Sequence, residues 1–148
     1  MPRLTYGADT VSSPEQVIDA ARDFTERRAE LWPNIDTYDT HEVTEDFADV
    51  TEGTNFLGKN FWARERYEWP EPGLIRTSTT DSNIFGAGSS WQLRVTARDG
   101  GSRVEVVNDR QMKHDPVSVL VGLGMRLTKR QYRTELEEFL TRVENRAG

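Results

Sequence analysis

Residues 37–112 form one long series of strand-like segments, and this feature restricts the fold more than any other. Thr, Val, Tyr, Trp and Phe, which favour strands, are frequent there. Turn-forming residues interrupt the series at short intervals, and we expect strands at residues 37–44, 46–52, 61–69, 74–81, 89–98 and 103–112. Short turns join consecutive strands in antiparallel order. The pattern therefore predicts a single antiparallel sheet, which twists and curls.

A helical pattern precedes this series. Residues 4–8 alternate as a short first strand, and Ser13 then suits the N-cap of a helix. Pro14 fits the first helical position, and Gln16 lies three residues after the cap, as in a capping box. Apolar residues recur at helical spacing as far as Leu31, and Pro33 ends the pattern. We expect one or two helices here.

A second helical pattern closes the chain. Apolar residues recur from Pro116 to Val143, which predicts a helix over residues 116–145. At about 1.5 Å per residue such a helix would be about 45 Å long. It would have to run along the whole sheet. Gly122 and Gly124 in its first half would either leave room for a ligand or allow close packing against the sheet.

Strands that are segregated from helices indicate the α+β class. We therefore expect a curved antiparallel sheet of about six or seven strands wrapped around a long C-terminal helix, with residues 1–148 as one domain. A helix is about 10 Å wide, so it cannot fill a deeply curled sheet everywhere. We therefore expect an internal pocket between the sheet and the C-terminal helix.

The composition excludes several classes of function. The chain has no cysteine, which rules out disulfides, thiolate metal sites and cysteine nucleophiles. A net charge of −6 argues against nucleic acid as a partner. The longest apolar run, residues 117–125, is shorter than the ~20 residues that span a bilayer. With no N-terminal signal segment visible, we expect a cytoplasmic protein without stable membrane insertion.

We expect no metal ion and no cofactor. His41 and Asp39 occupy alternate strand positions, which make a poor metal site. Gly86 and Gly88 come before a predicted strand, whereas a phosphate-binding loop needs a helix N-terminus. The Gly-x-Ser-x-Gly pattern of serine hydrolases is absent.

Four segments, in this order, resemble the START-like (SRPBCC) superfamily, and most of all its polyketide cyclase/dehydrase and lipid-transport branch. They are residues 12–17 with Leu31-Trp32-Pro33, residues 88–95, residues 100–104, and the terminal helix from Gly122 to Glu144. The resemblance implies the helix-grip fold and an apolar or amphipathic ligand between sheet and terminal helix. It implies no catalytic residue, because the superfamily has no universal catalytic motif.

Alternation along the strands assigns side chains to the inner face. In residues 61–69 the more apolar face contains Glu65, which would be buried and would need a cation or a proton. In residues 103–112 the face that begins at Val104 brings Asn108 and Arg110 inward. Arg110 would either neutralise Glu65 or hold a ligand carboxylate. Trp62 and Phe85 are further candidates for the pocket wall.

The candidate ligand-binding residues combine these inner faces with the terminal helix. They are Phe61, Ala63, Glu65, Tyr67, Trp91, Leu93, Asn108, Arg110, Leu120 and Gly124. Each residue also has a purely structural interpretation as a core residue or a member of an ion pair, and no catalytic residue is assigned.

Three hypotheses of function stay open. In the first, the chain binds a small hydrophobic or amphipathic ligand, lipid-like or polycyclic, in an internal pocket. In the second, the chain is an enzyme of the polyketide cyclase/aromatase type, in which polar pocket residues such as Glu65, Arg110, Asn108 or Tyr67 move protons. In the third, the chain is a protein-interaction or regulatory module. A homodimer is compatible with all three.

Overall fold

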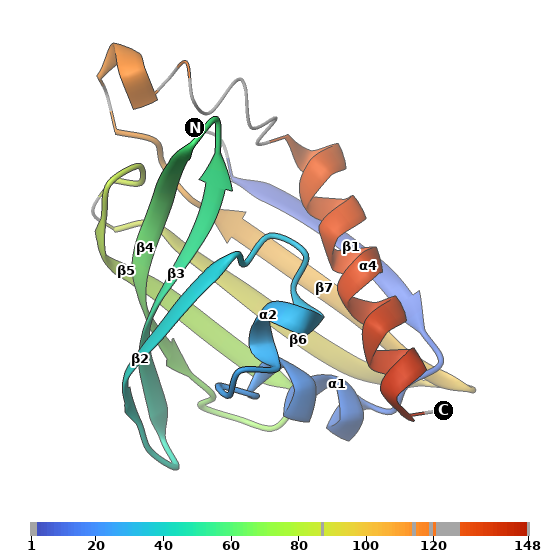
Figure 1. Ribbon diagram of the computed structural model, residues 1–148. Helices are drawn as coiled ribbons and strands as arrows, with labels where there is room; N and C mark the ends of the chain where they lie inside the picture. Colours follow the sequence, from blue (N-terminus) through green and yellow to red (C-terminus); the bar gives the residue numbers. More distant parts are fainter. Residues whose placement is uncertain (1–2, 87, 114, 119, 121–127, 148) are drawn as a thin grey trace.

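The computed structural model describes residues 3–86, 88–113, 115–118, 120 and 128–147. Seven strands form one antiparallel sheet, with two short helices after the first strand and a longer helix at the C-terminus (Figure 1). In chain order the elements are β1 (Leu4–Thr10), α1 (Pro14–Ala21), α2 (Arg28–Leu31), β2 (Thr37–Val43), β3 (Phe47–Phe56), β4 (Lys59–Glu68), β5 (Leu74–Ser82), β6 (Ser90–Arg98), β7 (Gly101–Asp109) and α4 (Lys129–Ala147). The predicted α+β class and curved antiparallel sheet are confirmed.

The strand order is β1-β7-β6-β5-β4-β3-β2. Each strand from β2 to β6 pairs with the next strand in the chain, and β1 lies at the far edge, paired with β7. The connection between the strands predicted at residues 46–52 and 61–69 is shorter than expected, because β3 and β4 run on to a two-residue turn. Leu57 and Gly58 there have φ values of 51° and 76°, as in the tight turns that match strand twist.

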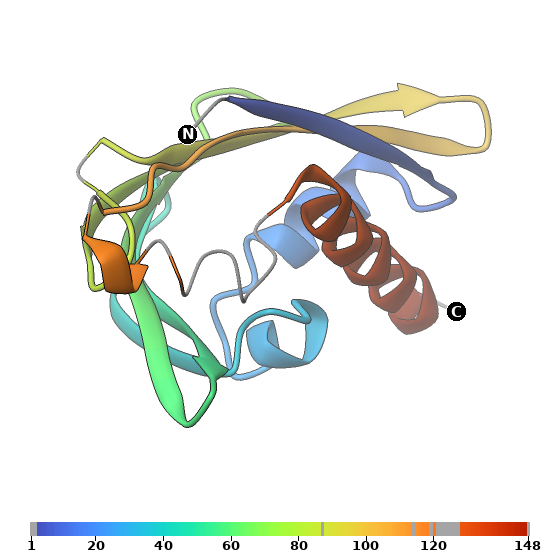
Figure 2. The same cartoon turned by 90° about the horizontal axis from the view of Figure 1, so that it is seen from above.

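The sheet bends so that its concave face encloses the helices. Seen from above, β1, β7 and β6 form one wing, and β3 and β4 turn away from it (Figure 2). Helix α4 lies against the β1 wing, and α1 and α2 fill the same concave side (Figures 1 and 2). The helices therefore cover one half of the concave face more closely than the other.

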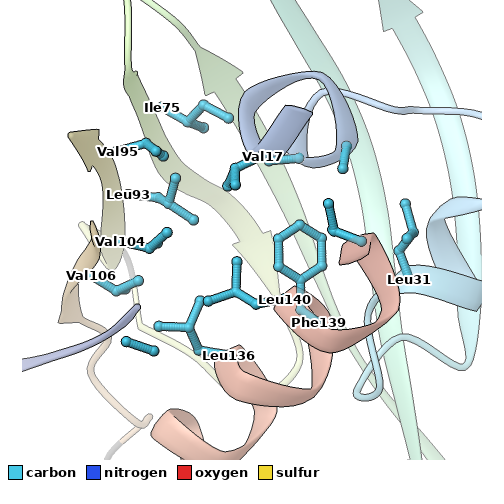
Figure 3. Close-up of a cluster of buried hydrophobic side chains, with 14 of the residues drawn as sticks. Val17, Leu31, Ile75, Leu93, Val95, Val104, Val106, Leu136, Phe139 and Leu140 are labelled. Carbon is cyan, nitrogen blue, oxygen red and sulfur yellow. The ribbon is translucent and has the colours of Figure 1, made fainter. Parts of the chain in front are cut away.

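The core lies between helices α4 and α1 on one side and strands β5, β6 and β7 on the other. Leu136, Phe139 and Leu140 of α4 point toward the inner side chains of the sheet, and Val17 of α1 packs beside them (Figure 3). The apolar members from the strands alternate along the chain, which is why one face of each strand is buried. These sheet residues are Ile75, Leu93, Val95, Val104 and Val106.

The capping box predicted for the first helix is present. The Gln16 amide N–H donates to Ser13 Oγ (3.2 Å), and the Ser13 amide N–H donates to Gln16 Oε1 (2.8 Å). The helical pattern divides into two helices, since α1 ends at Ala21 and α2 begins at Arg28. Trp32 follows α2 and stacks on Phe139 of α4, with ring centroids 3.8 Å apart.

The prediction of one helix over residues 116–145 was wrong in its start and length. Helix α4 begins at Lys129, where Thr128 acts as the N-cap and accepts from the Gln131 amide (3.3 Å). Its 19 residues span about 28 Å rather than about 45 Å. A separate helical turn at residues 116–118, capped by the Asp115 carboxylate, lies apart from α4 (Figures 1 and 2). Gly122 and Gly124 lie outside the described residues.

Candidate ligand-binding cavity

A cavity of about 350 Å³ lies on the concave side of the sheet. Its wall takes residues from β1, β3, β4, β6 and β7, from the chain that follows α2, and from the first turns of α4. Strands β3 and β4 provide part of this wall, and they bend away from the wing that holds α4 (Figure 2). The helices on the concave side do not fill this space, and the surrounding side chains leave it open.

The structure brings eight of the ten predicted ligand-binding residues to this cavity. They are Phe61, Ala63, Glu65, Tyr67, Trp91, Leu93, Asn108 and Arg110. Trp62 and Phe85 also border it. Each of the eight lies on the predicted inner face of β4, β6 or β7, or just beyond β7 in the case of Arg110.

Of the other two predicted residues, one lies elsewhere and one lies outside the described residues. Leu120 has 69% of its surface exposed and does not line the cavity. Its assignment assumed one continuous helix from Pro116, whereas residues 116–118 form a turn set apart from α4 (Figure 1). Gly124 lies outside the described residues, so its assignment stays a prediction.

Glu65 and Arg110 form a buried ion pair in the cavity wall. Arg110 Nη2 lies 2.5 Å from Glu65 Oε1, and Thr79 Oγ1 donates to Glu65 Oε2 at 3.0 Å. Only 1% of the Glu65 side chain and 15% of the Arg110 side chain are exposed. Burial raises the pKa of Glu65 above its usual value, and the positive charge of Arg110 opposes that shift. Of the two roles expected for Arg110, the structure shows the ion pair with Glu65, and a contact with a ligand carboxylate stays a prediction.

A second buried ion pair, which the sequence analysis missed, joins α2 to β3. Arg28 Nε lies 2.5 Å from Glu52 Oε2, and Arg28 Nη1 donates to the Ala21 carbonyl oxygen at 2.9 Å. The guanidinium also lies over the rings of Phe24 and Tyr67, at 4.5 and 4.8 Å from their centroids. Cation–π contacts of this kind are strong when desolvated, so Arg28 binds α2 tightly to the sheet.

Tyr67 belongs to this second pair through its hydroxyl, which donates to Glu52 Oε1. Burial and the neighbouring Glu52 carboxylate raise the pKa of Tyr67 well above its usual value, so the hydroxyl keeps its proton. Glu52 shares a strand face with Ala48 and Val50, both fully buried. That alternation was the sequence signal that could have identified Glu52 as an inward carboxylate.

A polar cluster from β1 and α4 forms another part of the wall. The rings of Tyr6 and Tyr132 stack with centroids 6.0 Å apart. Burial raises the pKa of both phenols. One turn further along α4, Glu135 accepts from Gln131 Nε2 at 3.3 Å. Burial raises the pKa of Glu135, and the hydrogen bond from Gln131 and the charge of Arg110 oppose it.

The aromatic part of the wall centres on Trp91. Its ring meets those of Trp32 and Tyr67 edge-to-face, with centroids 6.2 and 5.7 Å apart. Aromatic rings provide a large apolar area for a ligand. The cavity therefore combines an aromatic surface with buried, hydrogen-bonded charges.

His41 lies away from the cavity, on the exposed strand β2. Its Nε2 is 2.7 Å from Thr51 Oγ1 on the neighbouring strand. Among the residues that the structure describes, no three metal-binding side chains come together. Within the same residues, no helix is both long and apolar enough to cross a membrane.

Comparisons with known proteins identify the fold. No family model and no curated protein sequence matches the chain. Among solved structures, TTHA0849 from Thermus thermophilus matches with a TM-score of 0.81 and 15% identity, over 99% of this chain and 100% of the other. The Zhui aromatase/cyclase from Streptomyces sp. R1128 matches with a TM-score of 0.73 and 16% identity, over 99% and 96%. A START superfamily protein from Mycobacterium smegmatis matches with a TM-score of 0.72 and 14% identity, over 97% and 95%.

These matches cover nearly the whole chain, so the fold is that of the START-like (SRPBCC) proteins. The structural neighbours include aromatase/cyclases and START superfamily proteins. At identities of 14–16%, these matches establish the arrangement of the backbone and not the side chains of the site. The resemblance predicted from the sequence is confirmed at the level of the fold.

Proposed function

We propose that this chain binds a small hydrophobic or amphipathic molecule in the cavity between the sheet and α4. The observation that supports this function is the cavity itself, with a volume of about 350 Å³. Ligand sites in proteins commonly measure about 300–1,000 Å³ and combine apolar walls with a few placed polar groups. Trp32, Trp91 and Tyr67 provide the apolar wall here, and Arg110 provides a polar group.

Affinity would come mainly from burial of the ligand's apolar surface, at roughly 25 cal/mol per Å². A lipid-like or polycyclic molecule has the apolar area that such a site needs. The buried polar groups would fix its orientation. Residues 1–148 would act as one domain in this function, in the cytoplasm.

The second candidate function is catalysis of the aromatase/cyclase type. Two observations favour it, namely the structural likeness to the Zhui aromatase/cyclase and the convergence of Glu65 and Arg110 in one cavity. Against it, each of these groups already binds the other, and Tyr67 is bound to Glu52. Groups that move protons need a free face toward the substrate. We therefore place binding first, and Glu65→Gln and Arg110→Ala would have to abolish turnover for catalysis to replace it.

A role as a protein-interaction or regulatory module has less support. Such a role would suit a cavity filled by the chain's own side chains, and the open volume does not favour it.

Native mass spectrometry of protein purified from its own host tests the proposal. We expect a population with one small apolar molecule bound per chain, released when the protein is denatured. A protein free of any such molecule, with no rise in melting temperature in a panel of lipids and polyphenols, would contradict ligand binding.

A further inference from the structure

The two edges of the sheet differ in how they are covered. At one edge α4 lies along β1, and Thr10 Oγ1 of β1 donates to Glu144 Oε2 of α4 at 2.7 Å. At the other edge, β2 pairs with β3 and with no other strand of the described chain (Figure 1). Every residue of β2 except Tyr38 is exposed. An uncovered edge strand presents backbone N–H and C=O groups that can pair with another chain.

The backbone groups at the end of β2 can be assigned to a side. The Thr44 amide donates to the Phe47 carbonyl oxygen at 2.8 Å, across the turn that joins β2 to β3. In an antiparallel ladder, hydrogen-bonded pairs alternate with pairs that are not hydrogen-bonded to each other. The next pair, Val43 and Ala48, is therefore of the second kind. The N–H and C=O groups of Val43 consequently point toward the open side of the sheet.

Two kinds of side chain alternate along this edge. Thr40 and Val43 lie opposite residues of β3 that are fully buried on the concave face. Asp39 and Glu42 lie opposite residues of the convex face, and a β-bulge at His41 brings them onto that face despite their spacing of three. The edge therefore offers uncharged side chains on its concave side and carboxylates on its convex side.

The edge is acidic, and its carboxylates have no cationic partners within the described chain. Four exposed acidic residues belong to β2 and the turn after it, and none of them is in an ion pair between described residues: Asp39, Glu42, Glu45 and Asp46. The sequence has no Lys or Arg from residue 29 to residue 58. Unpaired charges of one sign favour a partner of the opposite sign.

A second copy of this chain fits the edge poorly. Two β2 strands side by side would bring Asp39 and Glu42 of both copies together, and like charges on neighbouring strands are destabilising. The bulge also twists the edge away from another rigid sheet. A flexible basic peptide has neither difficulty, because it can follow the twist and neutralise the carboxylates.

We propose that β2 binds an extended basic segment of a partner protein, which adds to the sheet as a further strand. Its backbone pairs with the open side of β2, as in other cases of strand addition. Its apolar residues lie beside Thr40 and Val43, and its alternate Lys or Arg residues lie beside Asp39 and Glu42. None of the described residues of β2 lines the cavity, so this inference is independent of the proposed function.

Synthetic peptides of about the length of β2 test this proposal on the full chain. A peptide of alternating lysine and valine should bind with a dissociation constant of roughly 10–100 μM at low salt, and amide NMR shifts should concentrate in β2. The same peptide with every backbone nitrogen methylated keeps its charge but loses its donors, so it should bind at least about tenfold more weakly. A glutamate–valine peptide should not bind.

Three results with these samples would overturn the proposal. They are no saturable binding of the lysine–valine peptide, equal binding of its methylated form, and NMR shifts centred outside β2. Sedimentation of the protein alone provides a further test, because a dimer that the peptide dissociates would assign the edge to a second copy instead.

Val43→Pro tests the backbone contact from the side of the protein. It removes the free N–H but no hydrogen bond to β3, and proline is tolerated on an edge strand where its nitrogen faces solvent. It should weaken binding of the lysine–valine peptide by at least about tenfold. Val43→Thr keeps the N–H and should bind as wild type does. Unchanged binding in folded Val43→Pro would contradict strand addition at this residue.

A pair of double variants tests the charge contact. Asp39→Lys with Glu42→Lys should weaken binding of the lysine–valine peptide by at least about tenfold. Asp99→Lys with Glu105→Lys changes two exposed acids at β6 and β7, so it alters the net charge equally and should retain most of the binding. Equal losses in the two double variants would show that net charge, and not this edge, attracts the peptide.

Discussion

Arg28 and Glu52 are joined by an ion pair that is almost completely enclosed, with Nε 2.5 Å from Oε2 and side-chain exposures of 1% and 10%. The pair links α2 to β3. It also places the Tyr67 hydroxyl, which donates to the same carboxylate. One side of the cavity wall therefore depends on this pair.

Removing one partner of the Arg28–Glu52 ion pair should lower the stability of the protein. We expect Arg28→Met to lower the free energy of unfolding by about 3–5 kcal/mol, because Glu52 would stay buried without a cation. Denaturant unfolding measures this loss. Arg64→Met, which breaks an exposed pair with Asp49, serves as the control and should cost less than about 1 kcal/mol. A similar loss of unfolding free energy in both variants would show that the enclosed pair stabilises the protein no more than the exposed pair does.

The Glu65 carboxyl should make stability depend on pH. Its pKa is raised in the folded state by burial, so the folded protein holds this proton more tightly than the unfolded chain does. Stability from this group is therefore fully present below the unfolded pKa and falls as the pH rises toward the folded pKa. Melting temperatures of wild type and Glu65→Gln between acid and neutral pH should diverge accordingly, with wild type losing stability relative to the variant. A constant difference across that range would contradict the raised pKa.

The start of α4 can be tested at its cap. Thr128→Ala removes the oxygen that accepts from the Gln131 amide and should cost about 1 kcal/mol of unfolding free energy. Thr128→Ser keeps the acceptor and should retain most of the stability. If the alanine variant is as stable as wild type, Thr128 is not the cap of an independent helix.

The strands and their faces could be predicted from the sequence because strand alternation has a fixed period of two. Once Phe61 and Val104 were assigned to the inner face, Glu65 and Arg110 followed without further information, and they proved to be partners. The alternation also fixed which face of β6 and β7 covers the core.

Other parts of the site could not be predicted in the same way. Arg28 lies among exposed charged residues on a four-residue helix, where periodicity is too short to define a buried face. Its partner Glu52 comes from a strand 24 residues away. The start of α4 was missed because the apolar pattern continues through Gly122 and Gly124. Thr128 and Gln131 have the spacing of a capping box, and this pair is the local sequence signal for the start of α4.

The cavity itself is tested most directly by filling it. Ala63 is buried on the inner face of β4 and lines the cavity, so Ala63→Phe should occupy space that a ligand needs. Ala97, an exposed alanine on β6, offers the matched control Ala97→Phe. Both variants should be shown to fold by circular dichroism before binding is compared.

The deciding measurement is a fluorescence titration of these proteins with the neutral probe phenylnaphthylamine. We predict one bound probe per chain for wild type and for Ala97→Phe, with a dissociation constant of roughly 1–10 μM. Ala63→Phe should bind at least about tenfold more weakly. No saturable binding to wild type, or equal binding to folded Ala63→Phe, would contradict the claim that this cavity is a ligand-binding site.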